Sequence, residues 1–233
     1  MRWLNVLFQI LMLLSIAGCS AEKQLARKYV DTHKGNAVMI VPVYTLFKDN
    51  SSISYDTSYK YNQEQLDSIA WAQSCFVKYI SDSVFLTTYT NSLINELSTY
   101  GYDVYVDGSA DVFLSLSDPK WLIQLEQMQL TESHTIDYQT IYSLDGSVTY
   151  EPYRQNKVDF GTWFHLNRAN SESRQLLYLN TYVQDRKVSL VALTYGNNAG
   201  VSKNDSVRLD HVYLLAAETG RKQAELIFDY FMN

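Results

Sequence analysis

Side chains that commonly carry out catalysis or bind metals are present in this chain, but no known motif groups them. The four histidines are far apart in sequence, and none lies in an HxH or HExxH pattern: His33, His134, His165 and His211. The sequence also lacks the GxSxG nucleophile motif and a glycine-rich phosphate-binding loop. We therefore predict no catalytic residue, no metal site and no cofactor, and we favour a non-enzymatic function.

Paired carboxylates are the catalytic arrangement that the sequence leaves open, because a glycosidase needs only two acids several ångströms apart. The candidate acids are Asp111, Asp118, Glu126 and Asp159. Each is explained better as a solvated surface charge or a turn residue, and Asp118 precedes a proline, as turn residues often do. A glycan or peptidoglycan hydrolase is therefore the third functional hypothesis.

Aromatic residues offer a different kind of site. Three of the nineteen tyrosines, Tyr55, Tyr59 and Tyr61, lie in a segment rich in Ser, Asp and Asn, and Trp163 is expected on the less apolar face of a strand. Exposed aromatic rings can stack on sugar rings or pack against a protein partner. These four residues are the candidate ligand or partner contacts. The interpretation that we favour over a contact role is that the tyrosines cover the domain as a lid and that Trp163 packs beneath the C-terminal helix.

The N-terminal segment carries the clearest signal in the chain. Residues 1–18 combine one positive charge, at Arg2, with an apolar run that ends in small residues, as export signals do. A helix over this run rises about 1.5 Å per residue and is too short to cross a bilayer core of about 30 Å.

Ile16-Ala17-Gly18-Cys19 resembles the lipobox of bacterial lipoproteins, in which the cysteine becomes lipidated and N-terminal. The resemblance implies a lipid anchor on Cys19. Each buried CH₂ then contributes about 0.8 kcal/mol to membrane binding.

The residues after Cys19 bear on location. In lipoproteins of the Escherichia type, aspartate after the cysteine favours inner-membrane retention, so Ser20 implies the outer membrane. The acidic tract that some Bacteroides-type lipoproteins use for surface display is reduced here to Glu22. We therefore expect the protein to face the periplasm rather than the cell surface. The chain as a whole resembles small envelope lipoproteins of Bacteroides-type bacteria, and this resemblance implies no activity.

Composition narrows the partners further. The net charge of −6 argues against nucleic acid as a partner, because nucleic acid attracts basic surfaces. With Cys19 lipidated, Cys75 is the remaining cysteine, so no intramolecular disulfide can form. We expect Cys75 to be a buried structural residue, since free cysteine is among the most buried residue types.

The first half of the chain reads as a strand, a loop and a long helical segment. Residues 37–44 predict a strand buried on both faces, with Pro42 at an edge or bulge. Residues 45–62 are polar and predict a long loop. Apolar spacing of three and four predicts helix over 63–99, either as one helix or as two, with Gly101 as its stop.

Short strands dominate the middle of the chain in this interpretation. Residues 102–106 and 110–116 predict two short strands, and residues 121–130 and 134–143 predict a meander. Asp145-Gly146 predicts a two-residue hairpin turn.

The second half also contains the best amphipathic strand and the C-terminal helix. Residues 158–166 alternate most regularly, and residues 175–183 are expected to pair with 188–195. After a polar loop over 196–204, a helix is expected to begin at Asp205 or Ser206 and to reach Phe231. Gly220 within that helix indicates a close contact, which we expect to be with the sheet.

These elements predict one α+β domain over residues 37–233, behind a signal segment at 1–18 and a lipidated tether at 19–36. The sheet is expected to be mostly antiparallel, with a long helical segment after the first strand and the C-terminal helix packed on the sheet. The favoured function is a non-catalytic, lipid-anchored envelope protein that binds or scaffolds another envelope component. The alternative from another class is a surface-exposed glycan-binding lipoprotein.

Overall fold

A six-stranded mixed sheet forms the centre of the computed structural model, in the order β3-β1-β4-β5-β6, with β2 pairing with β4 beyond the end of β1. β1 pairs in parallel with β3 and with β4, and β2 pairs in parallel with β4. β5 pairs in antiparallel orientation with β4 on one side and with β6 on the other. The strands are β1 (Ala37–Val41), β2 (Leu46–Asn50), β3 (Asp103–Tyr105), β4 (Lys120–Tyr142), β5 (Val148–Arg168) and β6 (Gln175–Gln184). A separate two-stranded sheet pairs β7 (Arg186–Ser189) with β8 (Ser202–Asp205).

The structure describes residues 36–52, 61–117, 120–142, 148–168, 174–189 and 202–232, with a few positions between 24 and 32. The signal segment at 1–18 and Cys19 lie outside these residues, so the predictions made for them remain predictions. In the part of the chain that is described, no helix is both long and apolar enough to cross a membrane.

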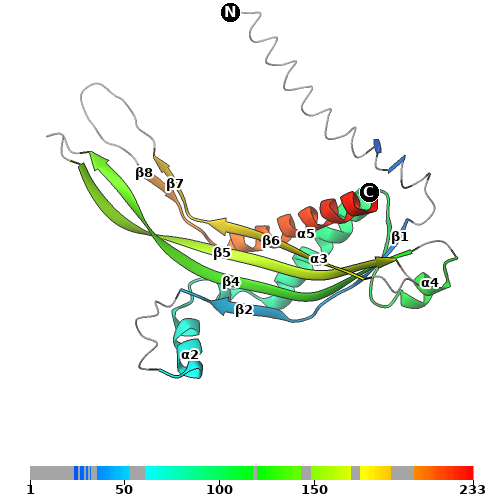
Figure 1. The fold of residues 1–233 in the computed structure, drawn as a ribbon, viewed down its shortest axis with the longest axis horizontal. Coiled ribbons are helices and arrows are strands. Elements are labelled where there is room, and N and C mark those ends of the chain that lie inside the picture. The colour runs from blue at the N-terminus through cyan, green and yellow to red at the C-terminus, as the bar shows by residue number, and fades with distance from the viewer. Residues whose placement is uncertain are drawn as a thin grey trace, which may run out of the picture.

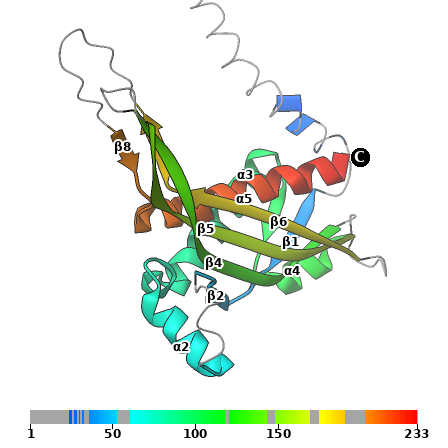
Figure 2. The same ribbon diagram turned by 60° about the vertical axis from the view of Figure 1, so that its left-hand side comes forward.

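Two long helices cover one face of the sheet. Figures 1 and 2 show α3 (Asp82–Thr99) and α5 (Leu209–Met232) side by side on the same side of β4, β5 and β6. The remaining helical elements are α2 (Gln63–Gln73), the single 3₁₀ turn η2 (Val77–Tyr79) and α4 (Ala110–Ser115). The α+β prediction, with the C-terminal helix packed on the sheet, is thereby confirmed.

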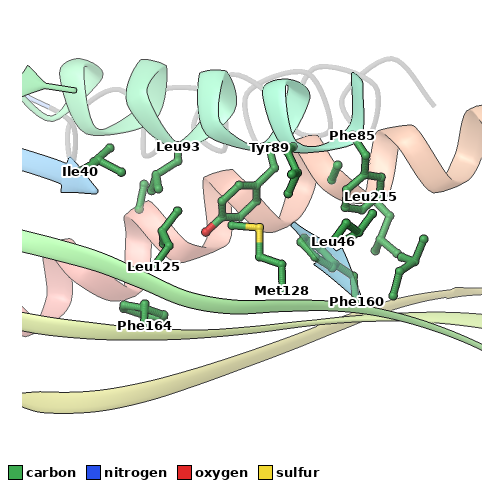
Figure 3. Close-up of a cluster of buried hydrophobic side chains, with 14 of the residues drawn as sticks. Ile40, Leu46, Phe85, Tyr89, Leu93, Leu125, Met128, Phe160, Phe164 and Leu215 are labelled. Carbon is green, nitrogen blue, oxygen red and sulfur yellow. The ribbon is translucent and has the colours of Figure 1, made fainter. Parts of the chain in front are cut away.

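The alternation of β5 explains why this face is covered. The positions predicted to point one way are all buried against the helices: Val158, Phe160, Thr162, Phe164 and Leu166. Figure 3 shows Phe160 and Phe164 within the cluster that β5 and β4 form with α3 and α5. The Phe160 ring meets Phe85 and Tyr89 of α3 edge to face, at centroid distances of 4.7 Å and 5.7 Å. Such aromatic pairs contribute about 0.5–1.5 kcal/mol beyond their buried area.

Buried polar groups tie the two layers together. The Tyr89 hydroxyl of α3 and the Thr162 hydroxyl of β5, the latter at 3.1 Å, both donate to Gln223 Oε1 on α5. Burial raises the pKa of Tyr89, so its hydroxyl stays protonated and able to donate across the whole ordinary pH range.

The first strand is buried on both faces, as predicted, but it is shorter than the predicted range 37–44. Val38 and Ile40 of β1 pack in the main core, while Ala37 and Met39 pack on the other face against Phe113 of α4. The strand ends at Val41, before Pro42, which lacks the N–H that a ladder needs.

The polar segment after β1 is not all loop. Leu46–Asn50 forms β2, with Leu46 buried and Asn50 donating through Nδ2 to the Ala70 carbonyl at 2.7 Å. Phe47 and Asp49 alternate with these residues and face solvent, and the consecutive polar residues 48–50 concealed the strand pattern in the sequence.

Residues 63–99 form two helices, and a buried carboxylate holds the break between them. Glu132 of β4 accepts bonds from the backbone N–H of Cys75, Phe76 and Val77 and from the Ser74 hydroxyl, at 2.7–3.2 Å. The chain leaves α2 at this point, and Cys75 is exposed. The prediction of a buried Cys75 was therefore wrong, because it assumed that the helix continues through the cysteine. The predicted stop is confirmed: Gly101, with φ +100°, follows α3.

Two further expectations of strand pattern were wrong. The strand predicted over 110–116 is helix α4 (Ala110–Ser115), and the buried Lys120 Nζ donates to the Phe113 and Leu114 carbonyls at its end. The expected meander is one strand, β4, with an irregularity between Leu125 and Gln127 that lets the strand bend and continue. Its hairpin with β5 is confirmed, while the turn residues 143–147 lie outside the described part.

The pairing of the last strands also differs from prediction. β6 pairs with β5, and β7 pairs with β8 instead of following β6 back along the sheet. Asp185, between β6 and β7, accepts bonds from Asn156 and from the backbone N–H of Val207, which fixes this corner. β8 also occupies part of the expected polar loop.

Beyond Glu132 on β4 and Lys157 on β5, these two strands continue as an arm without neighbours in the six-stranded sheet, over residues 133–142 and 148–156. Four large apolar side chains are exposed on this arm: Ile136, Tyr138, Val148 and Tyr150.

The final helix begins at Leu209, later than predicted, and Gly220 marks a helix-to-helix contact instead of a helix-to-sheet contact. A Cβ at Gly220 would lie 2.5 Å from the Tyr89 carbonyl oxygen and 2.9 Å from the Leu93 backbone nitrogen of α3. The close approach of α3 and α5 therefore requires glycine at this position.

Gly220→Ala should destabilise the protein although alanine is the better helix former. We expect the free energy of unfolding to fall by about 2 kcal/mol, because backbone atoms of α3 must move away. Denaturant unfolding followed by circular dichroism measures this. Arg221→Ala, at the exposed neighbouring position, is the matched control and should change stability by less than about 0.5 kcal/mol. Equal or higher stability of Gly220→Ala would contradict the assigned contact.

Candidate functional site

The face of the sheet opposite α3 and α5 carries the candidate site. Because strand residues alternate between faces, the residues between the buried positions of β4, β5 and β6 point outward here. Strand register aligns them in three rows across the sheet. We call these nine residues the aromatic platform: Gln127, Trp163 and Tyr178; Gln129, Gly161 and Asn180; Thr131, Asp159 and Tyr182.

An aromatic pair lies at the centre of the platform. The Trp163 and Tyr178 ring centroids are 4.5 Å apart, with 36° between the ring planes. A Cβ built on Gly161 would lie 3.1 Å from Tyr178 Oη and 3.2 Å from two carbons of the Trp163 ring. Both side chains therefore extend over the glycine, close to the sheet surface, and Tyr178 remains 51% exposed.

Polar side chains surround this pair. Lys157 Nζ lies 2.7 Å from Asp159 Oδ1 and 4.7 Å from the centre of the Tyr182 ring. Asn180 Nδ2 donates to the same Asp159 oxygen at 3.3 Å. Gln127 donates to Gln129, and Gln129 donates to Thr131, both at 3.4 Å. The amides are thus held in a row beside the aromatic rings, with both donors and acceptors available.

Of the four residues predicted as contacts, the structure places one on the platform. Trp163 faces outward, whereas its neighbour Thr162 points to Gln223 of α5, so Trp163 does not pack beneath the C-terminal helix. Tyr61 is exposed directly before α2, and among the described residues no ring contact joins it to Trp163. Tyr55 and Tyr59 lie outside the described part of the chain.

Tyr178 and Tyr182 are the platform residues that sequence reasoning missed. Both alternate with buried or half-buried residues in the strand expected at 175–183. That alternation could have indicated an exposed aromatic row. It could not have placed this row beside Trp163, because β6 was expected to pair with another strand.

The candidate acids do not form a glycosidase pair in the described residues. Glu126 Oε1 lies 3.7 Å from His165 Nε2, while Asp159 lies six residues along β5 from His165, about 20 Å at 3.3 Å per residue. Glycosidase carboxylates are about 5–9.5 Å apart. Asp111 is on α4, and Asp118 is not described.

The histidines do not converge either. His134, His165 and His211 lie on β4, β5 and α5, and His33 is not described. Burial, with the Arg154 guanidinium, lowers the pKa of His134, which favours its neutral form. Among the described residues, no group of three or more His, Cys, Asp and Glu side chains could hold a metal ion.

The described residues also line hollows, one of which Tyr182 of the platform borders. A pocket of about 310 Å³ lies between β6 and α5, and an open groove of about 530 Å³ lies between α3 and the chain that follows β1. The groove falls within the size range of ligand pockets but contains no histidine, cysteine, lysine or arginine. Its lining is Pro42, Val43, Tyr44, Asp82, Ser83, Leu86, Thr87, Thr90, Asn91, Ile94, Val106 and Asp107.

Comparison with known proteins adds little to this geometry. No protein-family model matches the chain, and no curated protein matches it in sequence. One solved structure that is similar is a neuraminyllactose-binding hemagglutinin homolog from Helicobacter pylori, with 12% identity and a TM-score of 0.32. The match covers 83% of this chain and 81% of that one. A likeness at this level carries no argument about fold or function.

Proposed function

We propose that this protein is a non-catalytic, lipid-anchored binding protein of the bacterial outer membrane, and that its aromatic platform binds glycan. The observation that carries the glycan part is the Trp163–Tyr178 pair over Gly161, on the face of β5 and β6 opposite α3 and α5, where Tyr178 is exposed. Large exposed aromatic side chains on a soluble surface mark interaction sites more often than isolated apolar residues do.

The chemistry of the platform suits a sugar. The faces of a hexopyranose ring carry C–H groups, and its hydroxyls project from the rim. The C–H groups are attracted to the electron-rich face of an aromatic ring. The hydroxyls need partners that both donate and accept hydrogen bonds. The side-chain amides of Gln127 and Gln129 on β4 and of Asn180 on β6 provide such partners in the two rows that contain Trp163, Tyr178 and Gly161.

The anchor rests on the lipobox at Ile16-Ala17-Gly18-Cys19. A lipidated Cys19 would hold the domain at the membrane through a tether over residues 19–36. Ser20 after the cysteine supports delivery to the outer membrane. The presence of a single acidic residue in the next few positions, Glu22, supports a domain that faces the periplasm.

Removing either platform ring should weaken glycan binding. We expect Trp163→Ala and Tyr178→Ala each to lower affinity about tenfold or more for a glycan that a panel screen identifies, which corresponds to about 1.4 kcal/mol. Titration calorimetry on the full chain in detergent measures the affinity. Trp71→Ala and Tyr150→Ala remove exposed rings on α2 and on the arm, and both should bind as the unmodified protein does. If no glycan in the panel binds, or if all variants bind with equal affinity, the glycan site would be refuted.

Lipidation at Cys19 predicts a clear labelling result. Cys19→Ala should abolish incorporation of labelled palmitate and release the protein from the membrane fraction, because no acyl chain remains to be buried. Cys75→Ala is the matched control and should retain both label and membrane location. Unchanged labelling of Cys19→Ala would contradict the anchor.

A second candidate function, binding another envelope protein, is favoured by the arm. Ile136, Tyr138, Val148 and Tyr150 form exposed apolar surface beyond the cover of the helices. Apolar and aromatic side chains of this kind are enriched in protein interfaces.

Crosslinking in the native envelope tests this second candidate. We expect the unmodified protein to yield a product with another envelope protein, and Tyr138→Ser with Tyr150→Ser to lose it. Tyr44→Ser, an exposed tyrosine away from the arm, serves as control. A product that persists in the arm variant, or the absence of any product, would count against an arm-mediated partner.

A further inference from the structure

We infer that the aromatic platform selects neutral, equatorially linked oligosaccharides over anionic ones. This inference rests on the proposed glycan-binding function and specifies its ligand class.

The first argument is the charge on the platform face. Three carboxylates lie on this face or at its border: Asp159, Glu126 at the irregularity of β4, and Asp49 on β2. Lys157 is the one lysine or arginine at the outward positions of β2, β4, β5 and β6 in the described part of the chain, and the outward His165 lies 3.7 Å from Glu126. The Lys157 ammonium group is already bound to Asp159 and lies over the Tyr182 ring. No arginine occupies these positions among the described residues.

This arrangement opposes an acidic sugar. Proteins recognise carboxylates with paired donors from arginine or with uncommitted lysine. Lys157 and Asp159 neutralise each other, so a glycan carboxylate placed on this face would approach the negative charges of Glu126 and Asp49. The interaction between like charges at a surface is repulsive. The whole-chain charge of −6 has the same sign.

The second argument is the pattern of neutral polar groups. Gln129 and Asn180 lie directly across from Gly161 on the two neighbouring strands, and Gln127 lies across from Trp163. Amide groups at these places complement hydroxyl and acetamido groups, which also donate and accept without carrying charge.

The third argument is shape. Three rows along the strands span about 13 Å, and three strands span about 10 Å. Only Gly161, without a side chain, lies between the two amides in the central row. A flat oligosaccharide with equatorial linkages can lie along such a surface with its C–H faces on Trp163 and Tyr178.

Paired probes test the inference on the full chain in detergent. Cellohexaose and chitohexaose are the neutral probes, and hyaluronan hexasaccharide is the anionic one. We expect hyaluronan to bind about tenfold more weakly in low salt, with a smaller difference at 0.5 M NaCl because salt screens the repulsion. Equal or tighter binding of hyaluronan would overturn the inference and leave the proposed glycan function intact. Absence of binding by all three probes, with silence across a wider glycan panel, would instead overturn the proposed function itself.

Charge variants give a second, independent readout. Glu126→Gln combined with Asp159→Asn should reduce the ratio of the affinity for the neutral probes to the affinity for hyaluronan severalfold, since both substitutions remove negative charge from this face. Glu225→Gln, on α5, removes one exposed carboxylate on the opposite side of the sheet and should leave the preference unchanged. An unchanged preference in the double variant, with native circular dichroism, would show that these carboxylates do not set the selectivity and would overturn the electrostatic argument.

Discussion

The fold depends on one constraint: among the described helices, a layer made of α3 and α5 covers one face of the central sheet, whereas on the other face α4 packs at β1. α3 and α5 approach closely enough to act as that layer because Gly220 has no side chain. Phe160, Phe85 and Tyr89 then fill the space between the helices and β5. The long antiparallel strands keep their outward rows in solvent as a direct consequence, and the aromatic platform is the part of that face in which rings gather.

Buried polar contacts decide how the surrounding elements are placed. Glu132 ends the α2 region and orients η2 through backbone N–H groups, so the sheet itself determines where the helical segment breaks. Gln223 joins α5 to α3 and β5, and Asp185 joins the end of β6 to the approach to α5. Each of these groups is costly to leave unpaired in a low-dielectric interior, so each favours one arrangement of its neighbours.

The same architecture separates possible functions. A catalytic acid pair needs side chains that converge, and the sheet holds Glu126 on β4 and Asp159 on β5 far apart along the strand direction. A binding surface needs a stable array of rings and amides, which strand register provides without a deep pocket. The platform and the arm are therefore distinct surfaces, one suited to a flat glycan and the other to a protein partner.

Local pattern in the sequence determined the elements whose side chains have one clear periodicity. The alternation at 158–166, the apolar run of β1, the stop at Gly101 and the C-terminal helix were all predictable, because burial on one face repeats along a strand or helix. The lipobox prediction likewise depends only on adjacent residues. Tertiary structure alone decided which strand lies beside β6, why Cys75 is exposed and which element Gly220 approaches. Those outcomes depend on contacts between residues distant in sequence, such as Trp163 with Tyr178 and Glu132 with Cys75, and local periodicity carries no information about the partner.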